Sequence, residues 1–176
     1  MITREEAVQA LRQAGCSEEV VRHCITVEKI ALLIARKIHS DGHKVDVDFV
    51  SRGALLHDIG RARSHGVGHG VEGGKVLREL ELEKLARVAE CHVGAGIPAG
   101  EAKELGLSEK NLMPHTVEEK IVTYADKLAM GRRRVSYWSA LEAFKSDLGP
   151  EHPAVKRFKR LHDEVQHLMK KGGHGK

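Results

Sequence analysis

Aromatic residues are scarce in this chain of 176 residues, which has three phenylalanines, two tyrosines and one tryptophan. The core must therefore consist of leucine, isoleucine, valine and alanine. That mixture favours helices, because strands are enriched in aromatic and β-branched residues. The chain is 41% hydrophobic and 31% charged, which is typical of a globular protein. Its length allows one domain with a sizeable core.

Two further absences narrow the class of protein. No apolar run approaches the roughly twenty residues that cross a bilayer, and the amphipathic N-terminal segment MITREEAVQALRQ lacks the apolar stretch of a signal peptide. We therefore expect a cytoplasmic protein without a membrane partner. The three cysteines are an odd number without paired spacing, which argues against a disulfide framework and against a zinc ribbon.

The net charge of +4 is mild, but the basic residues gather in two places. One cluster is Arg132, Arg133 and Arg134, and the second comprises Lys156, Arg157, Lys159, Arg160, Lys170 and Lys171. A basic surface suits an anionic substrate or nucleic acid. The simpler interpretation, a solvated helix face beside acidic residues, is favoured, so nucleic acid is not the preferred partner.

Helix start and stop signals divide the chain into short amphipathic segments. Thr3 with Glu6 forms a capping box, and Ser17 starts a second helix after Gly15. Apolar periodicity predicts further helices, over residues 49–59, 69–80, 82–92, 116–130, 136–144 and 153–171, with an irregular stretch over 94–114. We predict an all-α, single-domain helical bundle. Its parts are an N-terminal helix (1–16), a core (17–135) and C-terminal helices with a basic, flexible tail, GGHGK (136–176).

Buried polar residues interrupt the apolar faces of three predicted helices. His23 lies in line with Val27 and Ile34 and so faces inward, although a single inward histidine is usually a satisfied core residue. The pair His57-Asp58 lies in the most apolar helix, and Asp126 lies in the apolar segment IVTYADKLAM. An ionised aspartate there costs several kcal/mol unless it is paired or binds a metal.

Either aspartate alone could cap a helix or form an ion pair. Two buried carboxylates and two buried imidazoles are better explained by convergence on one cation. Such a donor set suits Zn, Mn, Fe or Co, whereas Mg and Ca prefer oxygen ligands. Adjacent helical residues point about 100° apart, so His57 and Asp58 share an ion only if it lies between their directions.

The order of these residues resembles the H…HD…D pattern of the HD-domain superfamily of metal-dependent phosphohydrolases. The resemblance extends to the subclass signature HDIG, residues 57–60, and covers roughly residues 20–130. HGVEGGKVL, from His69, resembles the HPxxGAxxL segment of HD-GYP proteins. His92 in HVGAGIP resembles the next metal histidine, and YADKL resembles the closing aspartate motif.

The resemblance implies an HD-type helical bundle with two metal sites that share one residue. The first would be formed by His23, His57, Asp58 and Asp126, and the second by Asp58, His69 and His92. The cofactor would be one or two divalent transition-metal ions (Mn, Fe, Co, Ni or Zn).

Several positions depart from the HD-GYP pattern. Arg61 stands in place of lysine, Gly70 replaces proline, and Gly96-Ile97-Pro98 is no GYP triad. These differences argue against a cyclic-di-GMP substrate.

We predict a phosphomonoesterase or phosphodiesterase that cleaves an ester or anhydride of a nucleotide-like small molecule with metal-activated water. Asp58, Arg61 and Lys127 are the candidate catalytic residues, because cations near the metal would stabilise the transferred phosphoryl group. Lys127 is equally compatible with a plain surface lysine. His65 could support the site or contact the substrate, and His115 could belong to a loop or a lid, but a structural role is favoured for each. Alternatives are an HD-fold di-iron oxygenase and a non-catalytic, metal-containing nucleotide-binding regulator. The sequence does not determine the substrate, the native metal or the formation of a homo-oligomer.

Overall fold

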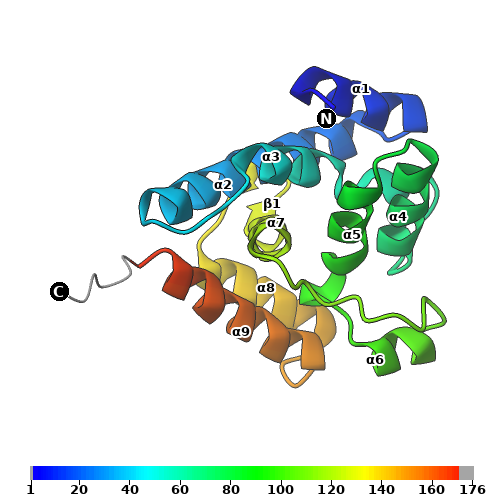
Figure 1. Ribbon diagram of the computed structural model, residues 1–176. Coiled ribbons are helices and arrows are strands. Elements are labelled where there is room, and N and C mark those ends of the chain that lie inside the picture. The colour runs from blue at the N-terminus through cyan, green and yellow to red at the C-terminus, as the bar shows by residue number, and fades with distance from the viewer. Residues whose placement is uncertain (1, 171–176) are drawn as a thin grey trace.

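A computed structural model describes residues 2–170, and these fold mainly into α-helices (Figure 1). The α-helices are α1 (Arg4–Ala14), α2 (Glu18–Ser40), α3 (Val47–Leu56), α4 (His69–Glu79), α5 (Glu83–Cys91), α6 (Ala99–Glu104), α7 (Val117–Lys127), α8 (Tyr137–Leu148) and α9 (Pro153–Leu168). Two 3-10 helices, η1 (Ile59–Ala62) and η2 (Val93–Ala95), and a hairpin of β1 (Ala129–Met130) with β2 (Arg133–Arg134) complete the described elements. The predicted all-α class is confirmed.

Side-chain caps start the helices where the sequence indicated. Thr3 and Thr116 each form a capping box with the glutamate three residues later, and the Ser17 hydroxyl accepts from the third amide of α2. Each cap satisfies a backbone N–H that has no partner within its helix. The first helix ends at Gly15, whose φ of 97° is a left-handed conformation that glycine adopts without strain.

Helix α7 runs through the middle of the molecule and is seen end-on in Figure 1, with α2 and α3 above it, α5 beside it, and α8 and α9 below it. Its residues Ile121, Val122 and Ala125 are fully buried and pack in one hydrophobic cluster with residues of α2, α3, α8 and α9. Asp126, one residue further along, is therefore carried toward the interior on this central helix.

A second hydrophobic cluster joins α1 to α3, α4 and α5. The position of α1 is fixed by a charge pair as well, because the Arg4 guanidinium donates to Glu28, whose side chain is almost fully buried. The Ser51 hydroxyl donates to the same carboxylate at 2.7 Å. A buried charge that is paired and hydrogen-bonded in this way avoids the cost of an isolated one.

Three predicted helix ends differ from the structure. The third helix ends at Leu56 rather than at residue 59, and α7 ends at Lys127 rather than at residue 130. At the ends of α3 and α7 the chain turns so that buried polar groups meet. Apolar periodicity alone does not predict such a turn. No strand is predicted after α7, yet residues 129–134 form the short hairpin. Helix α8 continues to Leu148, four residues beyond its predicted end.

Two expectations concern the ends and the environment of the chain. The predicted flexible tail GGHGK lies outside the described residues. None of the helices that the structure describes has the length and apolar character that crossing a bilayer requires.

Candidate metal centre

The pair His57-Asp58 lies where the backbone leaves α3. His57 is the helical C-cap, and Asp58 has φ −102° and ψ 12°, outside the α-helical range, before η1 begins. Our expectation that both residues project from one regular helix was therefore wrong. The break allows the two side chains, 0% and 2% exposed, to reach the same region without the angular restriction of a continuous helix.

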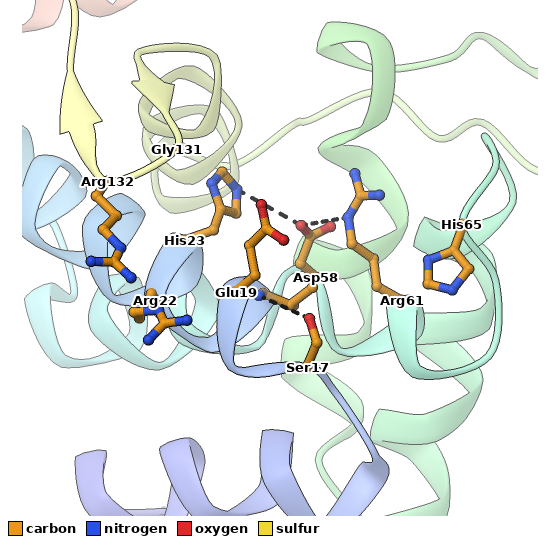
Figure 2. A pocket seen from close by; sticks show the side chains of 10 residues that line it. Ser17, Glu19, Arg22, His23, Asp58, Arg61, His65, Gly131 and Arg132 are labelled. Carbon is orange, nitrogen blue, oxygen red and sulfur yellow. Dashed lines mark hydrogen bonds and ion pairs between the residues drawn. The ribbon is translucent and has the colours of Figure 1, made fainter.

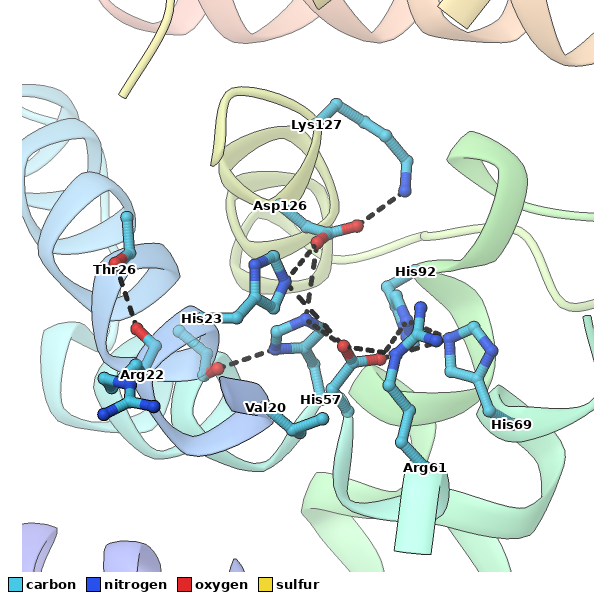
Figure 3. Close-up of polar contacts among 12 residues, drawn as sticks. Val20, Arg22, His23, Thr26, His57, Arg61, His69, His92, Asp126 and Lys127 are labelled. Carbon is cyan, nitrogen blue, oxygen red and sulfur yellow. Dashed lines mark hydrogen bonds and ion pairs between the residues drawn. The ribbon is translucent and has the colours of Figure 1, made fainter. Parts of the chain in front are cut away.

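One group of ligand atoms comes from α2, the end of α3 and α7 (Figure 3). The Nε2 atom of His23 lies 3.0 Å from Oδ1 of Asp126, and Nε2 of His57 lies 3.4 Å from the same oxygen. These atoms all lie within 4.8 Å of one another, a spacing that could hold a metal ion. Residues 103 positions apart in the chain are thus brought together.

A second group comes from α4 and the end of α5. Oδ1 of Asp58 lies 3.1 Å from Nε2 of His69 and 3.4 Å from Nε2 of His92. The two histidine Nε2 atoms are themselves 2.9 Å apart. His69 and His92 are both almost fully buried.

Asp58 stands between the two groups. Its Oδ1 faces His69 and His92, while its Oδ2 lies 3.7 Å from Nε2 of His23 and 3.8 Å from Nε2 of His57. One carboxylate with its two oxygens turned to different ligand sets has the geometry needed to bridge two cations.

Three of the four histidines are held in the same way by the backbone. The Nδ1–H groups of His57, His69 and His92 each donate to the carbonyl oxygen three residues earlier, at 2.7 Å. This bond leaves the Nε2 lone pair of a neutral imidazole directed at the centre, as in histidines that bind metals.

Some of these inward-facing atoms have no hydrogen-bond partner in the described chain. Nε2 of His57 and Oδ1 of Asp58 are buried without a hydrogen-bond partner. The Nε2 atoms of His69 and His92 approach each other although both Nδ1 atoms carry the donated proton. Buried polar atoms without partners are costly, and a cation would satisfy all of them. The donor set therefore fits a divalent metal ion.

The pKa shifts in the metal-free chain also favour a cation at this centre. Burial alone would lower the pKa of His57, but the charge of Asp58 and the contacts with Cys24 and Asp126 raise it well above its usual range. Burial would raise the pKa of Asp58, yet the neighbouring imidazoles hold it well below its usual range. Burial lowers the pKa of His92 to about 4, so this ring is neutral at neutral pH. Binding of a cation would displace the proton on His57.

Two cationic side chains border the carboxylates. The Arg61 Nε–H donates to Oδ2 of Asp58 at 2.7 Å, across one 3-10 turn, and the Arg61 side chain is about one-third exposed. The Lys127 ammonium donates to Oδ2 of Asp126 at 2.5 Å, and its side chain is only 15% exposed. Lys127 is thus not a plain surface lysine, one of the two interpretations that the sequence left open.

Glycine contacts bring the second group close to Asp58. A Cβ on Gly60 would lie 1.9 Å from the carbonyl oxygen of His69, so η1 can approach the start of α4 only with glycine there. A Cβ on Gly70 would lie 2.8 Å from the carbonyl oxygen of Ala89, so α4 and α5 are similarly close. His69 and His92 lie at the ends of these two helices.

The centre opens to solvent beside α2 and the hairpin (Figure 2). A pocket of about 590 Å³ is lined by His23 and Asp58 and by three arginines, Arg22, Arg61 and Arg132. Arg22 was not among the predicted site residues, although its position next to His23 was a usable signal. His65 lines this pocket, whereas the exposed His115 lines a different one and forms a weak contact with Asn111.

Comparison with known proteins places this geometry in context. A family model described as HD domain matches residues 20–131. An uncharacterized protein of Methanocaldococcus jannaschii is 48% identical over 167 residues, which cover 94% of this chain and 98% of that protein.

Two more distant similarities were found. The tRNA (cytidine(56)-2′-O)-methyltransferase of Picrophilus torridus is 33% identical over 93% of the chain, which spans only 46% of that enzyme. The crystal structure of the HD domain of the phosphodiesterase PgpH from L. monocytogenes aligns with a TM-score of 0.56 at 13% identity. The alignment covers 90% of this chain and 94% of that domain. At this identity the alignment shows a shared fold.

Proposed function

The chain belongs to the HD-domain family, and we propose that it is a metal-dependent phosphohydrolase acting on a nucleotide-like substrate. The observation that carries the proposal is the convergence of four imidazole nitrogens and two aspartate carboxylates, with Nε2 of His57 and Oδ1 of Asp58 buried without a hydrogen-bond partner. Mixed imidazole and carboxylate ligation is suited to Mn, Fe, Co, Ni or Zn.

In this proposal the two groups of ligand atoms hold one ion each. The first ion would be held by His23, His57, Asp58 and Asp126, and the second by Asp58, His69 and His92. A bound divalent ion supplies Lewis acidity, which lowers the pKa of water to about 7 and so provides a nucleophile at neutral pH.

The side chains of the chain itself would bind and orient the phosphate. Arg61 uses only Nε on Asp58, and its remaining N–H groups have no hydrogen bond to any described residue, so they can donate to phosphoryl oxygens. Arg61 also lines the open pocket. Lys127 offsets the charge of Asp126, and both cations would stabilise negative charge that develops on the phosphoryl group and the leaving group.

A nucleotide is the preferred substrate class. The pocket beside the centre carries three arginines, whose planar donors match phosphate. The name of one relative refers to tRNA, which supports a nucleotide-containing or RNA-derived substrate. A phosphomonoester and a phosphodiester are both compatible with the open side of the centre.

The proposal is tested with metal-free protein to which Mn²⁺ is added. We expect hydrolysis of bis-p-nitrophenyl phosphate or p-nitrophenyl phosphate, and a loss of at least about a hundredfold in Asp58→Asn, because the shared ligand is removed. Asp48→Asn, an exposed aspartate in the first turn of α3, is the matched control and should retain activity.

Failure to hydrolyse either ester with any of Mn²⁺, Co²⁺, Ni²⁺, Zn²⁺ or Fe²⁺ would reject the hydrolase. Oxygen consumption with bound iron and a mixed-valent EPR signal would then indicate the di-iron oxygenase. Nucleotide binding without turnover would indicate the regulatory module.

A further inference from the structure

The metal centre is flanked by two pockets of opposite character. The first is the arginine-lined pocket beside His23, about 590 Å³ in volume. The second, of about 1050 Å³, lies beside His69 and extends between α6, the end of α8 and the start of α9. Arg61 and His65 line both pockets, so a ligand held at the centre can extend into each of them.

The first pocket is cationic. Apart from the candidate ligands, its charged side chains are Arg22, Arg61, Arg132 and one carboxylate, Glu19. Figure 2 shows Arg22 and Arg132 on the hairpin side of His23, with Arg61 on the opposite side of Asp58. Three guanidinium groups against one carboxylate favour an additional anionic group next to the one at the centre.

The second pocket is apolar at its rim. Val67, Leu105 and Leu148 line it and are 42%, 49% and 40% exposed, and the partly buried Phe144 lies among them. Single exposed leucines are common, but several around one concave site are typical of a ligand-binding surface. The site is therefore suited to a planar or aliphatic group.

The charges of the second pocket disfavour phosphate. Arg157 donates both of its terminal N–H groups to Glu101, so these two charges offset each other. Glu104 and Asp147 also line the pocket, and neither forms an ion pair with a described residue. Away from Arg61, the unpaired charges are therefore negative and would repel a phosphate group.

We propose that the substrate is a nucleotide that binds across both pockets in one direction. The base occupies the apolar pocket at Leu105 and Leu148, the reacting phosphate lies at the centre, and a second phosphate contacts Arg22 and Arg132. This inference rests on the proposed function for the phosphate at the centre. It adds the orientation of the nucleotide between the two pockets. It also requires that the ligand that binds most tightly carries at least two phosphate groups.

The test is calorimetric titration of Mn²⁺-loaded protein, which needs no turnover. The probes are inorganic phosphate, adenosine 5′-monophosphate and adenosine 5′-(α,β-methylene)diphosphate. We expect the monophosphate to bind about tenfold more tightly than phosphate, because the base buries apolar surface. The diphosphate analogue should bind about fivefold more tightly again, through charge-assisted contacts that weaken with salt.

Two variants separate the two pockets. Leu105→Ser/Leu148→Ser should remove most of the advantage of the monophosphate over inorganic phosphate. Its matched control is Leu33→Ser/Leu80→Ser, in which two leucines of comparable exposure outside both pockets are changed. Arg132→Ala should remove the extra affinity of the diphosphate analogue, whereas Arg133→Ala, exposed but not lining the pocket, should leave it.

A dinucleotide with a 3′-phosphate, titrated in parallel, distinguishes an RNA-like source of the second phosphate from a nucleoside diphosphate. Equal affinities for inorganic phosphate, the monophosphate and the diphosphate analogue, or equal effects of the pocket variants and their controls, would overturn the inference. Hydrolysis of bis-p-nitrophenyl phosphate by the same preparations tests the hydrolase separately. If the protein hydrolyses the ester but the affinities do not follow the expected order, only the proposed orientation of the nucleotide is rejected. If the affinities follow the expected order but no hydrolysis occurs, only the hydrolase is rejected.

Discussion

The two carboxylates of the centre, Asp58 and Asp126, differ in the groups that their oxygens contact. Asp126 directs Oδ1 to His23 and His57, and its Oδ2 accepts a hydrogen bond from Lys127. Asp58 directs one oxygen to each histidine group, and Arg61 lies against the oxygen on the side of His23. Of the two aspartates, only Asp58 is therefore oriented to contact ions in both groups.

This difference predicts separate losses of the two ions. His69→Gln should lower the Mn²⁺ content from about two ions per chain to about one, because His69 contributes only to the group around Oδ1 of Asp58. Elemental analysis after gel filtration measures the content. His65→Gln, an exposed histidine nearby with no contact to either aspartate, is the control. A content of one ion in the wild type, or no loss in His69→Gln, would contradict the two-ion arrangement.

At the scale of elements, the position of the second histidine group depends on glycine packing. The turn η1 approaches α4 at Gly60, and α4 approaches α5 at Gly70. A side chain at either place would move the start of α4 or the end of α5, and with it His69 or His92. The glycine that follows His57-Asp58-Ile59 is thus required by packing, independently of any chemistry at the centre.

Gly60→Ala should lower the free energy of unfolding by at least about 2 kcal/mol, because its Cβ would meet backbone atoms that cannot move freely. Urea unfolding of the metal-free protein measures the change. Gly100→Ala is the matched control, since it lies within α6 and its Cβ would contact nothing. There we expect no loss, or a gain of about 0.5 kcal/mol. Wild-type stability of Gly60→Ala would show that the close approach is not required.

At the scale of the whole molecule, the three thiols are distributed through the interior. Cys16, Cys24 and Cys91 are all free and buried. Burial raises the pKa of Cys16 to about 11 and raises the pKa of the other two thiols as well. In the folded chain these groups stay protonated at a pH at which the unfolded chain has released the protons.

Stability should therefore fall as the pH rises above the unfolded thiol pKa of about 8.5. The unfolded state then binds fewer protons than the folded state, so the free energy of unfolding decreases with pH, for Cys16 up to about pH 11. Urea unfolding under reducing conditions between pH 8 and 10.5 measures the decrease. Cys16→Ala should show a smaller decrease than the wild type, and a flat or rising profile in the wild type would reject the effect.

The amino-acid sequence by itself determined the helical class and most helix starts. Thr3, Ser17 and Thr116 act within one turn of their own helices, so their effect is readable from neighbouring letters. Apolar spacing likewise identified His23 and Asp126 as inward-facing. Such local signals need no knowledge of how the helices pack.

Tertiary structure alone decided what these residues meet. The chain leaves helical geometry at Asp58, the carboxylate of Asp126 lies against two imidazoles from distant segments, and Lys127 turns inward rather than to solvent. The apolar and cationic pockets beside the centre combine helices far apart in the chain. Distances between such segments depend on side-chain packing across the whole interior, which local periodicity does not encode.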